Sequence, residues 1–306
     1  MPHIRWGASV LLGIIIGLLC AGVPPVAAQP DSSRAEIARF RDAQALAVDP
    51  LGRLYVADAG RDVVRIMDRT GQTLETLGGS GTRAGEFDGP TDVDPTNGQS
   101  VWVADAGNGR VQRFSEEGLF LEALPVGPSF LEDRGQRAFD DGRDGATVQG
   151  DGRPIAVVST SGDDTFVIDG RSDEVLKWDD QRRPERILGM GRGGEGDPQQ
   201  PVALALDGTR HLYVADRGQQ VVLEYDLFGT FVRRLDTPPL PNIQDLVVHQ
   251  GRLWIVCADR VFVWKSDAKT TVVHALDFPV PLVDAAQRED DLFLLTATAL
   301  YRRPSW

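Results

Sequence analysis

Four aspartates recur at the same place in a repeated motif and are the first candidates for acid, base or metal-ligand chemistry. They end the segments LYVAD, VWVAD, TFVID and LYVAD, as Asp58, Asp105, Asp169 and Asp216. A carboxylate can transfer a proton or bind a hard cation. A catalytic group has no reason to be copied in every repeat, however. The recurrence therefore favours structural aspartates, each accepting backbone N–H groups in the turn that follows its strand.

Histidines supply few further candidates. Of the four in the chain, His211, His249 and His274 lie beyond the N-terminal segment. His211 and His249 stand beside the equivalent first hairpin of two successive repeats, whereas His274 is expected on an outer strand. No His-Glu-x-x-His, cysteine-pair or Gly-x-Ser-x-Gly pattern is present in the sequence. The histidine pattern leaves the enzyme question open but leans against catalysis. The chain is expected to need no cofactor, with Ca or Zn held by His211 and His249 as the alternative.

Arginines form the most suggestive group of side chains. Five of them follow the repeated aspartate in successive repeats and two lie in loops between repeats: Arg61, Arg110, Arg171, Arg217 and Arg260, then Arg83 and Arg192. Both kinds of loop are expected on one face of the fold, where guanidinium groups could bind an anionic ligand or an acidic partner. The alternative is that each arginine pairs with a nearby carboxylate and only balances the surface charge.

The elements that position these residues are repeated β-rich units. The four aspartates are 47, 64 and 47 residues apart, and Pro90, Pro154 and Pro201 keep the same 64 and 47 rhythm. Two degenerate units follow, around 253–264 and 292–301, which gives six units of about 46 residues, near the size of a four-stranded propeller blade. The last unit has chain for only three strands, and segment 35–40 can supply the fourth. The sequence predicts an all-β, six-bladed β-propeller of antiparallel blades whose ring is closed by an N-terminal strand.

Three of the units resemble a known repeat. The segments YVADAG at 55–60, WVADAGNGRVQ at 102–112 and YVADRG at 213–218 are similar to the NHL repeat, with Pro90 and Pro201 in its blade-opening position. The resemblance implies an NHL-repeat six-bladed β-propeller over nearly all of the chain beyond the N-terminal segment. It implies less about activity, because such propellers include scaffolds, ligand receptors, RNA binders and lyases. The peptidyl-hydroxyglycine lyases of this kind and the related streptogramin lyases place histidines near the central channel, the former as metal ligands.

The N-terminal segment and the charge bear on location and partners. An apolar run over 10–23 and the small residues before Gln29 predict a signal peptide over 1–28, with an uncleaved anchor as the alternative. We therefore expect a secreted or periplasmic protein with one propeller over 29–306 and Cys257 as its single cysteine. The net charge of −13 argues against nucleic-acid binding. A Gly- and Asp-rich loop at about 126–153 is long enough to cover the arginine-bearing face.

These patterns favour a noncatalytic binding or scaffold propeller. The expected partner is a protein or a small anionic ligand, bound through the arginine-bearing loops by a monomeric propeller with no membrane span in its mature form. The alternative is a metal-assisted propeller lyase or a lactonase-like hydrolase that acts at the central channel.

Overall fold

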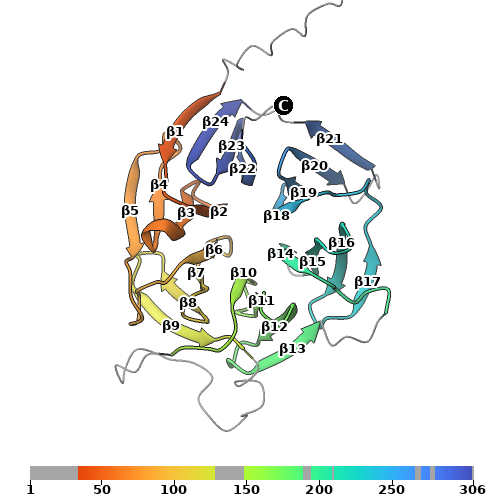
Figure 1. Ribbon diagram of the computed structural model, residues 1–306, viewed down its shortest axis with the longest axis horizontal. Coiled ribbons are helices and arrows are strands. Elements are labelled where there is room, and N and C mark those ends of the chain that lie inside the picture. Colours follow the sequence, from red (N-terminus) through yellow and green to blue (C-terminus); the bar gives the residue numbers. More distant parts are fainter. Residues whose placement is uncertain are drawn as a thin grey trace, which may run out of the picture. The chain divides into compact units, whose positions relative to one another are not determined.

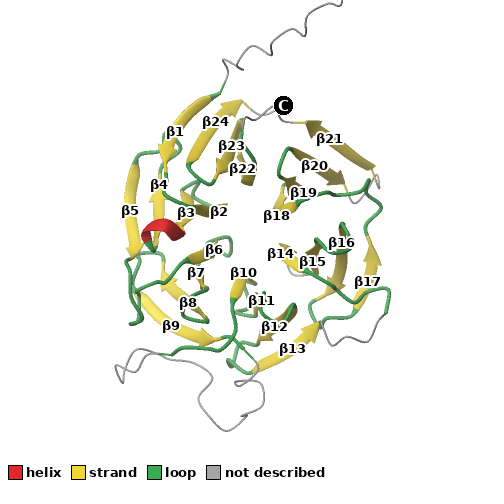
Figure 2. Cartoon of the chain, in the orientation of Figure 1, coloured by secondary structure: helices red, strands yellow, loops and turns green. Residues whose placement is uncertain are grey.

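The computed structural model describes residues 34–127, 148–188, 194–208, 210–265, 270–275 and 280–304. These residues form six four-stranded antiparallel sheets arranged around a central opening, as Figure 1 shows. One short 3-10 helix, η1 (Ala59–Arg61), is the only helical element among the described residues (Figure 2). The predicted all-β, six-bladed β-propeller is confirmed.

Each blade contains four strands in sequence order from the channel outward, except that the sixth blade takes its outer strand from the N-terminal part of the chain. Blade 1 consists of β2 (Ala43–Val48), β3 (Leu54–Asp58), β4 (Val63–Met67) and β5 (Thr73–Gly78). Blade 2 consists of β6 (Pro90–Asp94), β7 (Ser100–Asp105), β8 (Arg110–Ser115) and β9 (Phe120–Pro125). Blade 3 consists of β10 (Pro154–Ser159), β11 (Thr165–Asp169), β12 (Glu174–Trp178) and β13 (Pro184–Leu188). Blade 4 consists of β14 (Pro201–Asp207), β15 (His211–Asp216), β16 (Val221–Asp226) and β17 (Phe231–Arg234). Blade 5 consists of β18 (Ile243–His249), β19 (Arg252–Cys257), β20 (Arg260–Lys265) and β21 (Thr270–Ala275). Blade 6 consists of β22 (Leu282–Arg288), β23 (Asp291–Thr296), β24 (Ala299–Pro304) and β1 (Ala35–Arg39).

The ring closes where β1 pairs with β24, as the sequence predicts. Glu36 is opposite Tyr301 in this antiparallel pair, and Arg39 is opposite Ala299. Ile37 and Ala38 pack against the core between blades 6 and 1. The outer edge of β24 is thereby covered, so that it is not available to pair with another chain.

Deleting residues 1–39 is expected to weaken the ring more than deleting residues 1–33. The longer deletion removes the backbone pairing with β24 and the packing of the partly buried Ile37, which together contribute about 1.5–3 kcal/mol. At about 2–4 °C per kcal/mol, the unfolding temperature should fall by roughly 5–10 °C relative to the shorter variant. Calorimetry on both variants measures the difference, and equal unfolding temperatures would contradict a stabilising role for β1.

The core lies between neighbouring blades. Because the second strand of a blade is covered on both faces, every residue of β3 and β7 is buried, which explains the apolar run before each repeated aspartate. One cluster joins Tyr55 and Ala57 of blade 1 to Val93 and Val103 of blade 2, and comparable clusters join other adjacent blades.

The repeated aspartates fasten each second strand to the loop that enters the same blade. Asp58 accepts N–H groups from Arg41 and Asp42, at 3.1 and 3.0 Å, and Asp105 accepts the Asp88 N–H at 2.8 Å. Asp169 and Asp216 accept equivalent N–H groups from Arg153 and Gln199, and additional ones from the turn that follows their own strands. Most of the N–H donors thus lie 16 or 17 residues before each aspartate. Only some lie in the turn that follows the strand, which is where the sequence predicts them.

Antiparallel connection gives the propeller two distinct faces. The turns between second and third strands, η1 among them, lie on the same face as the loops that lead into the inner strands; we call this the η1 face (Figure 2). The turns between first and second strands lie on the opposite face. Within the described residues, no helix is long and apolar enough to cross a membrane. The predicted signal peptide and most of the predicted long loop at 126–153 lie outside the described residues and stay predictions.

Candidate functional site in the central channel

The six inner strands share an irregularity at their first residues, and in three blades a carboxyl group stands at this irregularity. In each strand the register shifts between the first and third residues, as between Pro90 and Asp92 in β6. The third residue is alanine in blades 1, 3 and 4 and aspartate in blades 2, 5 and 6: Ala45, Ala156 and Ala203, then Asp92, Asp245 and Asp284. We call the three aspartates the carboxyl layer.

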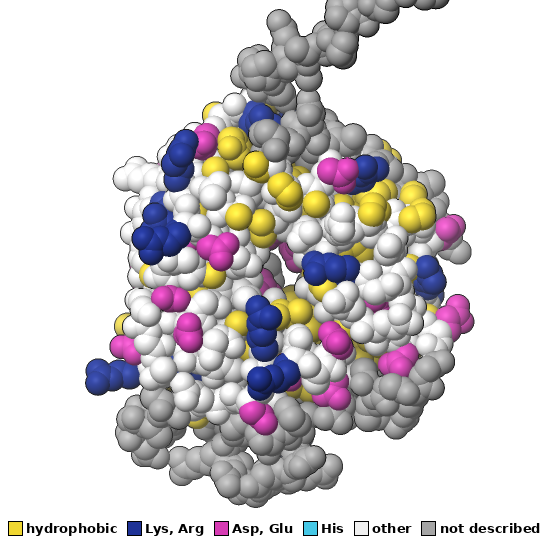
Figure 3. Space-filling view, in the orientation of Figure 1, with side chains coloured by type: hydrophobic (Ala, Val, Ile, Leu, Met, Phe, Trp, Pro, Cys, Tyr) yellow, Lys and Arg dark blue, Asp and Glu magenta, His cyan; other side chains and the backbone are white. Residues whose placement is uncertain are grey.

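Ring geometry places two members of the carboxyl layer on opposite walls. Asp92 belongs to blade 2 and Asp245 to blade 5, and blades 2 and 5 are three positions apart in a ring of six (Figure 1). Asp284 lies on blade 6, beside Asp245. Figure 3 shows acidic side chains inside the central opening. A molecule that enters the channel would therefore meet carboxyl groups on two sides.

Backbone hydrogen bonds hold two of these carboxyl groups in place. Asp284 Oδ2 accepts the Leu46 N–H at 2.6 Å, which ties blade 6 to blade 1, and Oδ1 accepts the N–H of Ala285 at 2.6 Å. Asp92 Oδ2 accepts the Val157 N–H at 2.7 Å, which ties blade 2 to blade 3. The carboxyl groups are thus fixed between blades rather than free to rotate into solvent.

The carboxyl layer cannot be fully ionised at neutral pH. Burial raises the pKa of Asp245 well above its usual range, and the neighbouring Asp284 charge raises it further. Burial raises the pKa of Asp284 to about 7, while its bonds from Asp245, Leu46 and Ala285 oppose the shift. Asp245 and Asp284 are hydrogen-bonded to each other and titrate as a pair, so a proton is held between the two carboxyl groups at neutral pH. Burial and the charge of Asp245 also raise the pKa of Asp92 well above its usual range.

A cavity of about 160 Å³ adjoins this layer. Its wall comes from the inner strands of all six blades and includes Asp92 and Asp245 together with apolar side chains such as Val48 and Leu246. Asp284 is 2% exposed and lies behind Asp245 rather than in this wall. Polar groups, among them Asp94, Thr96 and Gln287, share this wall about equally with apolar ones, which suits a small polar molecule.

His249 lines the same cavity, four residues beyond Asp245 on β18. Its Nε2 atom is shielded from solvent and has no hydrogen-bond partner among the described residues. Burial lowers the pKa of the His249 imidazole, and the charges of Arg288 and Arg252 lower it further. The imidazole is therefore neutral at neutral pH and could accept a proton or a hydrogen bond from a bound molecule.

The three predicted histidine positions diverge in space. His211 does not line the channel cavity; its Nδ1 lies 3.6 Å from both Asp207 Oδ2 and Glu224 Oε1. His274 lies on the outer strand β21, as expected. Over the described ranges, no group of three or more His, Cys, Asp or Glu side chains is arranged to hold a metal ion. The His211 and His249 metal alternative consequently has no third protein ligand in this part of the chain. The cysteine Cys257 is buried, and burial raises the pKa of its thiol to about 12.

The predicted arginine face is less uniform than the sequence suggests. Arg110 is completely buried: its Nε bonds Asp105 Oδ2 at 2.9 Å, and Nη2 donates to the carbonyls of Arg83 and Glu86. Arg110 was expected to contact a ligand, but it is the first residue of β8 rather than part of the turn. It is therefore a structural residue.

The other predicted arginines lie at or near the η1 face. Arg61 pairs with Asp58 and Arg260 with Asp259, at 2.6 and 2.5 Å. Three others are exposed, namely Arg83, Arg171 and Arg217. Arg171 Nη1 donates to the Asp151 carbonyl at 2.5 Å, and Arg217 Nη2 donates to the Ile243 carbonyl at 2.9 Å. Arg192 lies outside the described residues.

Sequence reasoning missed the carboxyl layer and one further arginine. The signal for the layer was present: an alanine or an aspartate occupies the same place in every inner strand, two residues after the blade-opening position. This position is inconspicuous in the sequence because its residue type changes from blade to blade, whereas the repeated aspartates keep theirs. The further arginine is Arg153, which precedes the blade-opening Pro154 and is exposed.

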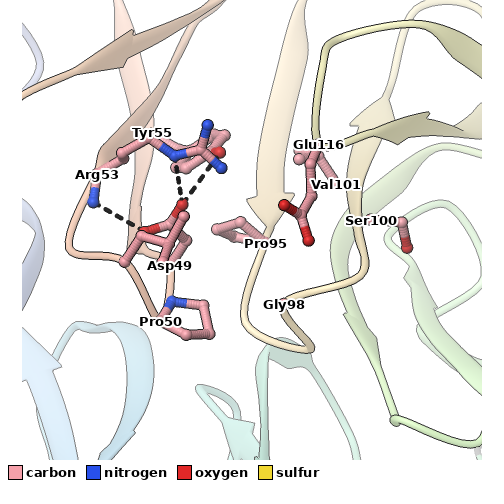
Figure 4. A pocket seen from close by; sticks show the side chains of 10 residues that line it. Asp49, Pro50, Arg53, Tyr55, Pro95, Gly98, Ser100, Val101 and Glu116 are labelled. Carbon is pink, nitrogen blue, oxygen red and sulfur yellow. Dashed lines mark hydrogen bonds and ion pairs between the residues drawn. The ribbon is translucent and has the colours of Figure 1, made fainter.

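A second hollow, of about 110 Å³, lies on the opposite face between blades 1 and 2 (Figure 4). Three of its polar groups bond one another: Asp49 accepts from Arg53 Nε at 2.6 Å and from the Tyr55 hydroxyl at 3.4 Å. Burial raises the pKa of Tyr55 to about 12, so the phenol stays protonated. This hollow has fewer free reactive groups than the channel.

Comparison with known proteins finds structures of similar fold but no related sequence family. No family model matches the chain, and no curated protein sequence matches it. A gluconolactonase from Xanthomonas campestris superposes with a TM-score of 0.63 at 15% identity, covering 89% of each chain. The virginiamycin B lyase of Staphylococcus aureus superposes with a TM-score of 0.58 at 8% identity, over 89% of this chain and 98% of that one. A streptogramin B lyase gives 0.58 at 11% identity, over 88% and 96%.

The chain is thus a six-bladed β-propeller, and its assignment to the NHL repeat stays a prediction. The expected function, a noncatalytic binding or scaffold propeller, is contradicted by these comparisons, because the three solved structures described above are two lyases and a gluconolactonase.

Proposed function

We propose that this protein is an acid–base enzyme that opens lactones at its central channel. The observation that carries the proposal is the carboxyl layer. Asp245, which shares a proton with Asp284, faces Asp92 across a cavity of about 160 Å³. Paired carboxyl groups with pKa values raised toward neutrality are suited to general acid–base catalysis. The gluconolactonase superposition supports a lactone as the substrate class.

In the hydrolytic reaction, Asp92 and Asp245 act on opposite sides of the bound ester. The ionised fraction of Asp92 removes a proton from water, and the water oxygen forms a bond to the lactone carbonyl carbon. The bond between this carbon and the ring oxygen then breaks, and Asp245 gives its proton to the departing oxygen. The product is a hydroxy acid, and exchange with solvent restores both carboxyl groups. Asp284 is a positioning residue, because it lies behind Asp245 and acts through it.

The lyase superpositions and His249 favour a second candidate, an elimination. One of the similar structures is a catalytically inactive histidine-to-alanine variant of virginiamycin B lyase with quinupristin, at a TM-score of 0.57 and 10% identity. In this chain the neutral His249 could remove a proton from carbon while the ester C–O bond breaks, forming a double bond and a carboxylic acid without consuming water. Reaction in H₂¹⁸O separates the two, since only hydrolysis places ¹⁸O in the product carboxylate.

The pH profile of lactone opening tests the acid–base proposal. We expect kcat/KM for D-glucono-1,4-lactone to rise with pH through about 7, because Asp284 must be ionised to hold the proton of Asp245 in place. The Asp284→Asn variant should change this acid limb, leaving only the part that reflects ionisation of Asp92, the proposed base. A pH-stat assay, corrected for spontaneous opening, measures both profiles. A flat profile between pH 5 and pH 9, or an unchanged limb in Asp284→Asn, would contradict the proposal.

A further inference from the structure

A hollow of about 510 Å³ on the η1 face lies at the start of two inner strands, β2 and β6, and beside the loop that leads into a third, β10. Gln44 of β2 and Thr91 of β6 contribute to its wall, and Thr91 directly precedes Asp92 of the carboxyl layer. The hollow therefore adjoins the channel mouth. A substrate whose ester reaches Asp92 would leave its remaining atoms here.

Two arginines of blade 3 line one side of this hollow. Arg153 is exposed, and its guanidinium has no partner among the described residues; only its backbone N–H is bonded, to Asp169. Arg171 is exposed too and has one described bond from its guanidinium, to the Asp151 carbonyl. Most donors of both side chains remain available for a bidentate contact with a carboxylate or phosphate.

Arg217 of blade 4 lies at the start of β18. Its Nε and Nη2 donate to the Ile243 carbonyl at 3.2 and 2.9 Å, two residues before Asp245. This double contact fixes the guanidinium beside the strand that carries the proposed acid. Figure 3 shows basic side chains close to the central opening, in a chain whose net charge is −13. We call Arg153, Arg171 and Arg217 the arginine rim.

The arginine rim and the carboxyl layer give the two ends of the site opposite electrostatic character. An anionic group inside the channel would lie against acidic side chains on two walls, which disfavours it. The same group at the mouth would meet guanidinium groups instead. Asp42 and Asp88 line the hollow as well, so the favourable position for an anion is the side formed by blade 3.

We propose that the arginine rim binds an anionic substituent of the substrate, so that the enzyme prefers lactones that carry a carboxylate. This inference rests on the proposed function and adds the substrate class. The rim anchors the carboxylate at the mouth while the neutral ester extends inward to Asp92 and Asp245.

Two lactones with the same ring test the preference. D-Glucaro-1,4-lactone carries a carboxylate, whereas D-glucono-1,4-lactone is neutral. We expect kcat/KM to be higher for glucarolactone than for gluconolactone. The ratio of the first value to the second should fall about 10- to 100-fold in the double variant Arg153→Gln/Arg171→Gln, which is the range expected for a lost charged hydrogen bond. Arg69→Gln removes one positive charge from an exposed turn on the opposite face, so compared with the single variants Arg153→Gln and Arg171→Gln it should leave the ratio unchanged. Thermal unfolding of each variant verifies folding.

Calorimetric binding to the Asp245→Asn variant separates this inference from the proposed function. If the wild-type enzyme opens neither lactone but glucarolactone still binds to Asp245→Asn, and adding the arginine substitutions abolishes that binding, the rim is supported and the catalytic proposal fails. If both lactones are opened and the arginine variant keeps the same ratio, the catalytic proposal holds and the rim proposal is overturned. Failure of glucarolactone both to bind and to react overturns the rim as well.

Discussion

The Asp245→Asn variant is expected to lose about 10²- to 10⁴-fold in kcat for lactone opening, the range typical of a lost general acid. The asparagine amide has nearly the shape of the carboxyl group but has no proton to give to the departing ring oxygen. Initial rates in a pH-stat assay measure the loss. Asp207→Asn makes the same change at the end of β14, outside the cavity wall, and should retain full activity.

The same substitution should stabilise the fold at alkaline pH. The pKa of Asp245 is raised in the folded state, so the folded chain binds more protons than the unfolded chain above about pH 4. Any stability that this group contributes is present at acid pH and is lost as the pH rises through its folded pKa. Asparagine does not ionise, so the free energy of unfolding of the variant relative to wild type should increase from pH 5 to pH 8.

Urea unfolding at both pH values measures this difference. A variant that keeps wild-type turnover would refute the catalytic role of Asp245. A variant that is more destabilised at pH 8 than at pH 5 would show that Asp245 is not the buried protonated group described above. Loss of activity together with gained stability is the pattern expected where a buried ionisable side chain is kept for function although it destabilises the fold.

Most of the fold could be predicted because each blade repeats the same physical requirements. The apolar run before Asp58 or Asp216 is buried on both faces, and the aspartate fastens the strand to the entering loop, so composition and spacing recur together. The closing role of 35–40 followed from counting strands in the last unit. The carboxyl layer was harder to predict, since Asp92, Asp245 and Asp284 are distant in sequence and meet only because the ring closes.

The arginines show a different limit of sequence reasoning. Arg110 and Arg217 both follow a repeated aspartate, yet one is the first residue of a buried strand and the other is exposed in a turn. The two turns have the same length: Arg110 stands five residues after Asp105, where Val221 begins β16 in blade 4, whereas Arg217 directly follows Asp216. Whether an arginine faces solvent or the interior thus depends on its exact position in the turn or strand, which its residue type alone does not reveal.

The Arg110→Met variant is expected to lose about 3–5 kcal/mol in the free energy of unfolding, because it leaves Asp105 as a buried charge without its cation. The carbonyls of Arg83 and Glu86 lose their donor as well. Arg61→Met is the matched control: its partner Asp58 is buried, but Arg61 itself is 48% exposed, so its loss should cost about 1 kcal/mol or less.

Urea unfolding of the two variants at pH 7 and pH 4 separates a lost charge pair from lost packing. Burial already raises the pKa of Asp105 in the presence of Arg110, and removing the cation should raise it further. Protonation of Asp105 at pH 4 then removes the uncompensated charge, so the deficit of Arg110→Met should shrink as the pH falls. A deficit that is equal at both pH values would mean that Arg110 acts by filling space. A deficit no larger than that of Arg61→Met would contradict the structural role of this buried pair.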